Sequence, residues 1–162
     1  MEEAETSAAG AARAKKKKKT KKNEKTLPLL PLRPELIRHV ETLGATAAPQ
    51  FICRKTLYKT DVDSNQNRLL FSCKTEFVAD HPITALLDGN ERETYFVHNC
   101  LQGLLVRTFD GRGNEFDLRL RYLTSNGGFR LIDQWNDLVS ANKLAKAVNS
   151  GRHVDLEVWA FR

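Results

Sequence analysis

The residues best suited to specific chemistry gather in two stretches of this chain of 162 residues. The first is a polar loop with its flanks, and it supplies Lys59, Ser64, Asn65, Gln66, Asn67 and Arg68. Asn and Gln amides can bond two edge atoms of adenine, Arg can do the same to guanine, and Lys and Ser suit phosphate oxygens. The alternative is an Asx-rich turn whose side chains bond only their own backbone, and we interpret Asp61 as such a turn former.

The second stretch supplies Arg119, Arg121, Thr124, Ser125, Asn126 and Arg130. Apolar and polar residues alternate over residues 115–124, which predicts a strand with Arg119 and Arg121 on the same face. The Asn126-Gly127 step that follows favours a hairpin turn with two positive φ angles. Two arginines on one face form a local positive stripe; the alternative is a solvated face balanced by Glu115 and Asp117.

The net charge of +6 lies almost wholly at the N-terminus. Residues 1–28 hold nine Lys and Arg against four Glu, whereas residues 29–162 hold 17 against 16 acidic residues. A folded part this close to neutral can bind phosphates only if its charges are segregated onto one face.

A basic tail is predicted over residues 1–27, and we expect it to be disordered because dense like charges repel and nothing there can be buried. Its cluster is Lys15, Lys16, Lys17, Lys18, Lys19, Lys21 and Lys22. Such a run is typical of a nuclear-import signal or a sliding contact to nucleic acid; the plainer alternative is a solubilising tail.

Several classes of function find no support. Cys53, Cys73 and Cys100 are odd in number and lack a paired spacing, which argues against a disulfide framework or structural zinc. His98 and Cys100 form no complete metal set, and no nucleophile, base or nuclease pattern appears, so we expect neither an enzyme nor a metal or cofactor. No secretory signal and no apolar run long enough for a membrane helix is present.

The remaining pattern predicts a linker and short helix over residues 28–48, then one β-rich domain over residues 49–162. In the helix, Leu36, Ile37, Val40 and Leu43 share one stripe and Gly44 closes the end. Strands are predicted at residues 51–58, 68–73, 101–109, 115–124, 129–132 and 153–161. A helical turn is expected around residues 76–79, and Asp133 is expected to cap a helix with Trp135, Leu138 and Val139 facing inward. We assign Trp135, Trp159, Phe116, Phe129 and Phe161 to the core rather than to a base-stacking platform.

The order of these motifs resembles the plant B3 domain family. The resemblance rests on KTLYKTDV at residues 55–62, NRLL at 67–70, DGRG at 110–113, EFDLRLRY at 115–122 and FRLIDQWNDLV at 129–139. WAFR at 159–162 and the helix at 32–44 are similar to one divergent subgroup. The usual Gly-Asp step before the last strand is replaced by Gly151-Arg152, after a longer loop.

This resemblance implies a mainly β fold, a seven-stranded open barrel with short helices, which binds double-stranded DNA in the major groove with two arms. One arm is the loop between the first two strands, and the other is the hairpin that contains residues 125–128. We therefore expect a nuclear transcription regulator that binds DNA, with other transcription regulators as possible further partners and with no small-molecule substrate. The alternative is a degenerate barrel that acts as a protein-interaction module, with nucleic-acid binding driven only by the tail.

Overall fold

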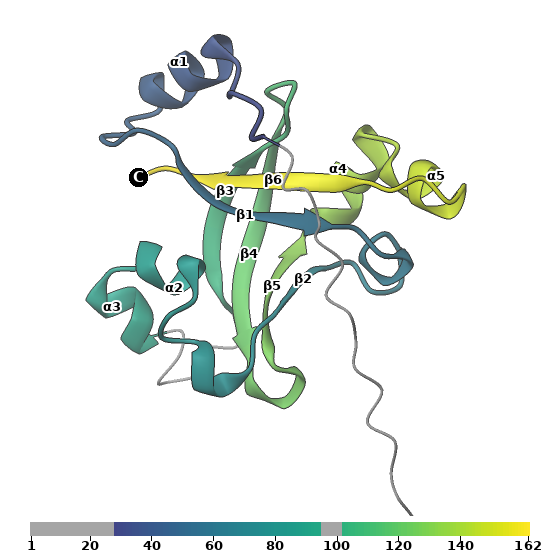
Figure 1. Cartoon of the computed structure of the whole chain (residues 1–162). Helices are drawn as coiled ribbons and strands as arrows, with labels where there is room; N and C mark the ends of the chain where they lie inside the picture. The colour runs from purple at the N-terminus through teal and green to yellow at the C-terminus, as the bar shows by residue number, and fades with distance from the viewer. Residues whose placement is uncertain (1–27, 95–101) are drawn as a thin grey trace, which may run out of the picture.

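The computed structural model describes residues 28–94 and 102–162, which form a mixed α/β fold of antiparallel strands and short helices (Figure 1). The strands are β1 (Gln50–Thr56), β2 (Leu69–Ser72), β3 (Leu104–Phe109), β4 (Glu115–Leu123), β5 (Gly128–Asp133) and β6 (Asp155–Ala160). One sheet pairs β1 with β6, and the other has the order β2-β5-β4-β3. The described residues thus hold six strands in two separate sheets, where the resemblance implies seven strands in an open barrel.

Short helices lie around the sheets (Figure 1). They are α1 (Pro34–Thr42), α2 (Pro82–Leu86), α3 (Gly89–Arg92), α4 (Trp135–Ala141) and α5 (Leu144–Asn149), with 3-10 turns η1 (Lys59–Asp61), η2 (Thr75–Phe77) and η4 (Thr124–Asn126). Within the described ranges, none of the helices has the length and apolar content that a membrane span requires. The N-terminal lysine cluster lies outside the described residues.

The core lies between the sheets and follows the predicted alternation of β4. Phe116, Leu118, Leu120 and Tyr122 are buried, and they pack with the wholly buried Phe129 of β5. This confirms the inward face of β4 and its pairing with the return strand, since Tyr122 lies opposite Phe129. The core assignment is less accurate at the end of the chain, where Trp159 and Phe161 are only half-buried.

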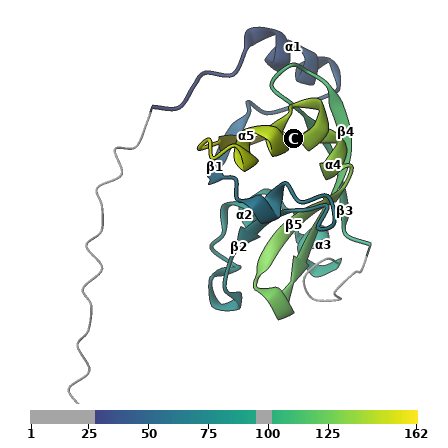
Figure 2. The ribbon, with the colours of Figure 1, turned by 90° about the vertical axis from the view of Figure 1, so that its right-hand side faces the viewer.

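The helix α1 lies at one end of the molecule, and the β4–β5 hairpin lies at the other (Figure 2). Val40 is buried and Gly44 has a φ of +97°, which confirms the apolar stripe and the glycine at the helix end. Leu43 departs from the prediction because it is 40% exposed. It follows the last helical residue and lies at the rim of a pocket.

Two local predictions around α4 are wrong. Asp133 does not cap the helix; it has a φ of +72°, and its carboxylate pairs with Arg119. Gln134 precedes the helix instead, and its side-chain oxygen accepts a hydrogen bond from the Asp117 backbone N–H at 2.8 Å. The long loop expected before the last strand is largely the helix α5, which ends where Gly151 adopts a φ of +82°.

Candidate nucleic-acid interface

The first arm is the connection between β1 and β2, residues 57–68, and a buried carboxylate sets its shape. The side chain of Asp61 accepts hydrogen bonds from the backbone N–H of Tyr58 at 2.9 Å and of Leu70 at 3.4 Å. It also forms an ion pair with Lys55 at 3.1 Å, and Asp61 is only 3% exposed. Asp61 therefore joins both ends of the arm, which confirms its interpretation as a turn former.

The tip of the first arm is a local turn organised by Asp63. Its side chain accepts from the N–H of Asn65 at 2.9 Å, and its carbonyl accepts from the N–H of Gln66 at 3.0 Å. The Asx turn predicted as the alternative thus exists, but Asp63 makes it. The side chains of Ser64, Asn65 and Gln66 remain exposed on the outside of the turn.

Residues at the start of α4 donate hydrogen bonds to the first arm. The Trp135 indole donates to the Asp61 carbonyl at 2.6 Å, and the Asn136 amide donates to the Ser64 carbonyl at 2.9 Å. The backbone N–H of Asn136 donates to the side-chain oxygen of Asn67 at 3.0 Å. Sequence reasoning missed Asn136, because no local pattern marks a residue whose partners lie about 70 positions earlier in the chain.

The second arm is the β4–β5 hairpin turn, residues 124–127. It is a 3-10 turn followed by Gly127 in the left-handed region, with a φ of +55°, rather than the predicted two-residue turn. The N–H of Cys73 donates to the Gly127 carbonyl at 2.9 Å, which holds the turn against the end of β2. Thr124 and Ser125 are exposed, and the side chain of Asn126 lies outside the described part of the chain.

The two arms lie at opposite ends of β2. The first arm leads into Leu69, and the second arm lies beyond Ser72, which is paired with Gly128. Four residues of extended strand span about 13 Å, close to the roughly 12 Å width of the B-DNA major groove.

Three arginines cross the outer surface between the arms, and we call Arg68, Arg130 and Arg121 the arginine row. On β5, Arg130 lies opposite Leu70 of β2 on one side and opposite Arg121 of β4 on the other. Burial, followed by the positive charges of Arg68 and Arg121, lowers the pKa of Arg130. This effect requires the three guanidinium groups to lie near one another, so the structure brings together residues from both predicted stretches.

The fourth predicted arginine has a different environment. Arg119 forms an ion pair with Asp133 at 2.9 Å, so its charge is balanced within the sheet. Glu115, one of the two acids expected to balance the stripe, pairs instead with Arg107 of β3 at 2.6 Å. The positive part of the surface is therefore the arginine row rather than the Arg119 and Arg121 pair.

Gly103 is a further residue that shapes this surface. It lies beside Arg121 with a φ of +72°, and a Cβ placed on it would lie 2.5 Å from the Arg121 Cγ and 2.7 Å from the Leu120 carbonyl oxygen. Any other residue would push the arginine side chain aside. The strand predicted from residue 101 begins only at Leu104, after this glycine.

A metal-dependent site has no geometric support within residues 28–94 and 102–162, where no group of three or more His, Cys, Asp or Glu is placed to hold an ion. The predicted weak candidates, His98 and Cys100, lie outside these residues.

The described residues thus form a small mixed α/β domain with two antiparallel sheets, a preceding helix and two polar arms at the ends of one strand. The family model described as "B3 domain-containing protein At2g31720-like" matches residues 32–162, and the chain belongs to this family. The B3 domain is a plant-type DNA-binding domain without catalytic activity. A search of curated proteins gave no match to the chain.

Proposed function

We propose that this protein is a nuclear regulator of transcription that binds double-stranded DNA, with its first and second arms in the major groove. The observation that supports this best is the arginine row, which lies between two arms separated by about the width of that groove.

Burial, followed by the neighbouring charges of Arg68 and Arg121, disfavours the charged form of Arg130 in the free domain and lowers its pKa. Phosphates would bring negative charge close to the three arginines and would release condensed counterions on binding. A solvated face without a ligand gains nothing from such clustering. The arrangement therefore favours a polyanionic partner over an uncharged protein surface.

Each predicted residue then has a proposed role. Asn65 and Gln66 are exposed at the tip of the first arm and can bond base edges. The Gln66 oxygen accepts from Arg68 Nε at 3.1 Å and the Asn67 oxygen accepts from α4, so these two amides offer mainly their NH₂ groups. Phosphate and sugar contacts come from the remaining polar and basic groups of the two stretches, which are Lys59, Ser64, Arg68, Arg119, Arg121, Thr124, Ser125, Asn126 and Arg130.

The basic tail adds two functions in this proposal. Its lysine cluster serves nuclear import, and its charge attracts DNA without regard to sequence. The domain contributes the preference for particular base pairs, but the 17 Lys and Arg of residues 29–162 are nearly balanced by 16 acidic residues, so we expect modest affinity and limited discrimination from it.

The test is a binding selection on random DNA duplexes, with the full chain and with a chain that lacks residues 1–25. An enriched motif shared by both proteins supports the proposal. Arg68→Ala and Arg121→Ala should then weaken binding to that motif, whereas Arg112→Ala, in the exposed β3–β4 turn, should not. If both row variants bind like the parent, the two-arm arrangement is wrong; if only the full chain binds, the tail alone accounts for nucleic-acid binding.

A further inference from the structure

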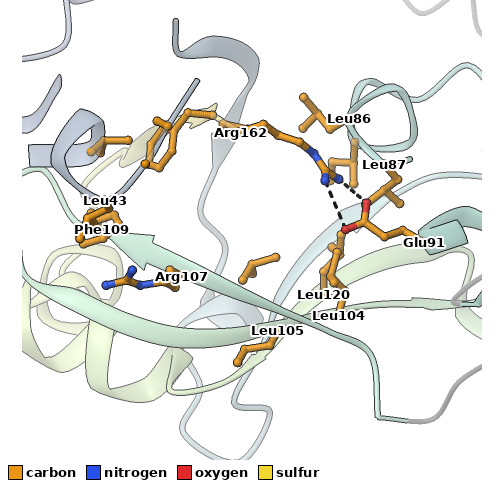
Figure 3. A pocket seen from close by; sticks show the side chains of 17 residues that line it. Leu43, Leu86, Leu87, Glu91, Leu104, Leu105, Arg107, Phe109, Leu120 and Arg162 are labelled. Atoms are coloured by element: carbon orange, nitrogen blue, oxygen red, sulfur yellow. Dashed lines mark hydrogen bonds and ion pairs between the residues drawn. The ribbon is translucent and has the colours of Figure 1, made fainter. Parts of the chain in front are cut away.

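A pocket of about 480 Å³ opens where the two sheets part, away from both arms (Figure 3). It lies between β3, the end of the chain after β6, and the helices α1, α2 and α3. A second hollow of about 310 Å³ shares part of its wall on the side of α1. The larger volume lies in the range of pockets that bind small molecules.

The walls of this pocket are mainly aliphatic. Leu104 and Leu120 come from the larger sheet, and Leu86 and Leu87 come from the α2 segment; in Figure 3 the side chain of Arg162 reaches the side of the pocket where Leu86 and Leu87 lie. Leu87 and Leu120 are buried, and Leu86 and Leu104 pack against the core. A ligand here would replace water on apolar surface, which is the main source of affinity in such sites.

The charges around the pocket are already paired. Arg162 contacts both carboxylate oxygens of Glu91, and Arg107 donates through Nε to Glu115 at 2.6 Å. Glu91 also accepts a hydrogen bond from the N–H of Asp88 at 2.9 Å, so the same carboxylate also caps the start of α3. An ionic ligand would lose its hydration here and would have to break one of these pairs to gain a partner.

We propose that this pocket binds an uncharged, largely apolar small molecule. None of the residues proposed to contact DNA lines the pocket. The site is therefore independent of the proposed function, and each can fail without the other.

The probe for the test is prodan, a neutral naphthalene ketone whose emission shifts to the blue in apolar surroundings, titrated with the full chain. We expect saturable binding at one site with a micromolar Kd. The matched anionic probe is 1-anilinonaphthalene-8-sulfonate, which should bind at least tenfold more weakly. This comparison needs no variant.

The site is located with two tryptophan substitutions at exposed leucines. Leu43 lines the rim and is 40% exposed, whereas Leu30 is 71% exposed and does not line the pocket. Leu43→Trp should fill the entrance and weaken prodan binding at least tenfold, and Leu30→Trp should leave it unchanged. The proposal is overturned if prodan does not saturate, if the sulfonate binds as tightly, or if the two variants bind prodan equally well.

Discussion

Replacing Arg130 with methionine should weaken DNA binding and at the same time stabilise the free domain. Burial and the neighbouring Arg68 and Arg121 lower the pKa of Arg130, which means that its charged form is disfavoured by folding. Arginine stays charged at every accessible pH, so the unfavourable term is always present. Methionine keeps an unbranched side chain over the same strand and removes the charge.

The two magnitudes follow from this environment. Arg130 is half-buried, so relief of repulsion is screened and contributes roughly 0.2–1 kcal/mol. For a domain of this size that corresponds to a rise of about 1–4 °C in the melting temperature. Loss of one arginine contact to DNA costs about 1–3 kcal/mol, which is roughly a 5- to 150-fold weaker Kd. The slope of log affinity against log salt should also fall by about 0.9 if that contact is a phosphate.

The assays are thermal unfolding and fluorescence anisotropy with a duplex from the selection, over a series of salt concentrations. Arg112→Met is the control, because it makes the same replacement in an exposed turn outside the arginine row. The reasoning is refuted if Arg130→Met binds like the parent, or if it melts at a lower temperature than Arg112→Met. Either result would mean that Arg130 contributes to the stability of the fold rather than to the binding of an anion.

Three other perturbations have defined outcomes. Asp61→Ala leaves the half-buried Lys55 and two backbone N–H groups of the first arm without their partner. The free energy of unfolding, measured by urea denaturation, should therefore fall by about 3 kcal/mol. An unchanged free energy of unfolding would contradict this role of Asp61. Burial raises the pKa of Asp110, but hydrogen bonds from Asn114, Asn142 and the backbone of Arg112 lower it by more. Asp110→Asn should therefore melt at a lower temperature than the parent at pH 7, and this difference in melting temperature should shrink as the pH falls below about 4 and the parent carboxylate is protonated. A difference that does not change with pH would be evidence against this role of the Asp110 charge. Removal of residues 1–25 should weaken binding to random-sequence DNA far more than binding to the selected motif; equal losses in anisotropy titrations would favour the interaction-module alternative.

The parts of the fold that follow from short-range pattern could be predicted from the sequence. The alternation along β4 predicted its inward face, and an apolar stripe closed by Gly44 predicted α1. Resemblance to a known family added the overall order of the elements. The predictions that failed concern single side chains with two competing partners, such as Asp133, which pairs with Arg119 rather than with the start of a helix. The helix α5 was missed because six residues give too little periodicity to distinguish a helix from a polar loop.

The sequence predicted which types of residue form the candidate site, but not how these residues are grouped in space. Lys59, Gln66 and Arg121 were identified as polar or basic groups near turns, but their grouping depends on the register across β2, β5 and β4. That register brings Arg130 beside Arg121, although the strands give no local sign of it. Similarly, the balance of Arg119 by Asp133 and of Arg107 by Glu115 could be known only from their distances.

The attachment of the first arm to α4 bears on how recognition in such a protein can diverge. Two of its three hydrogen bonds end on main-chain carbonyls, those of Asp61 and Ser64, which every amino acid possesses. The exposed positions 65 and 66 can therefore accept new side chains while the loop keeps its shape. If the first arm contacts bases as proposed, new base preferences can arise by substitution at positions 65 and 66 with little loss of stability, while Trp135, Asn136 and the side chains of Asp61, Asp63 and Asn67 keep the loop in place.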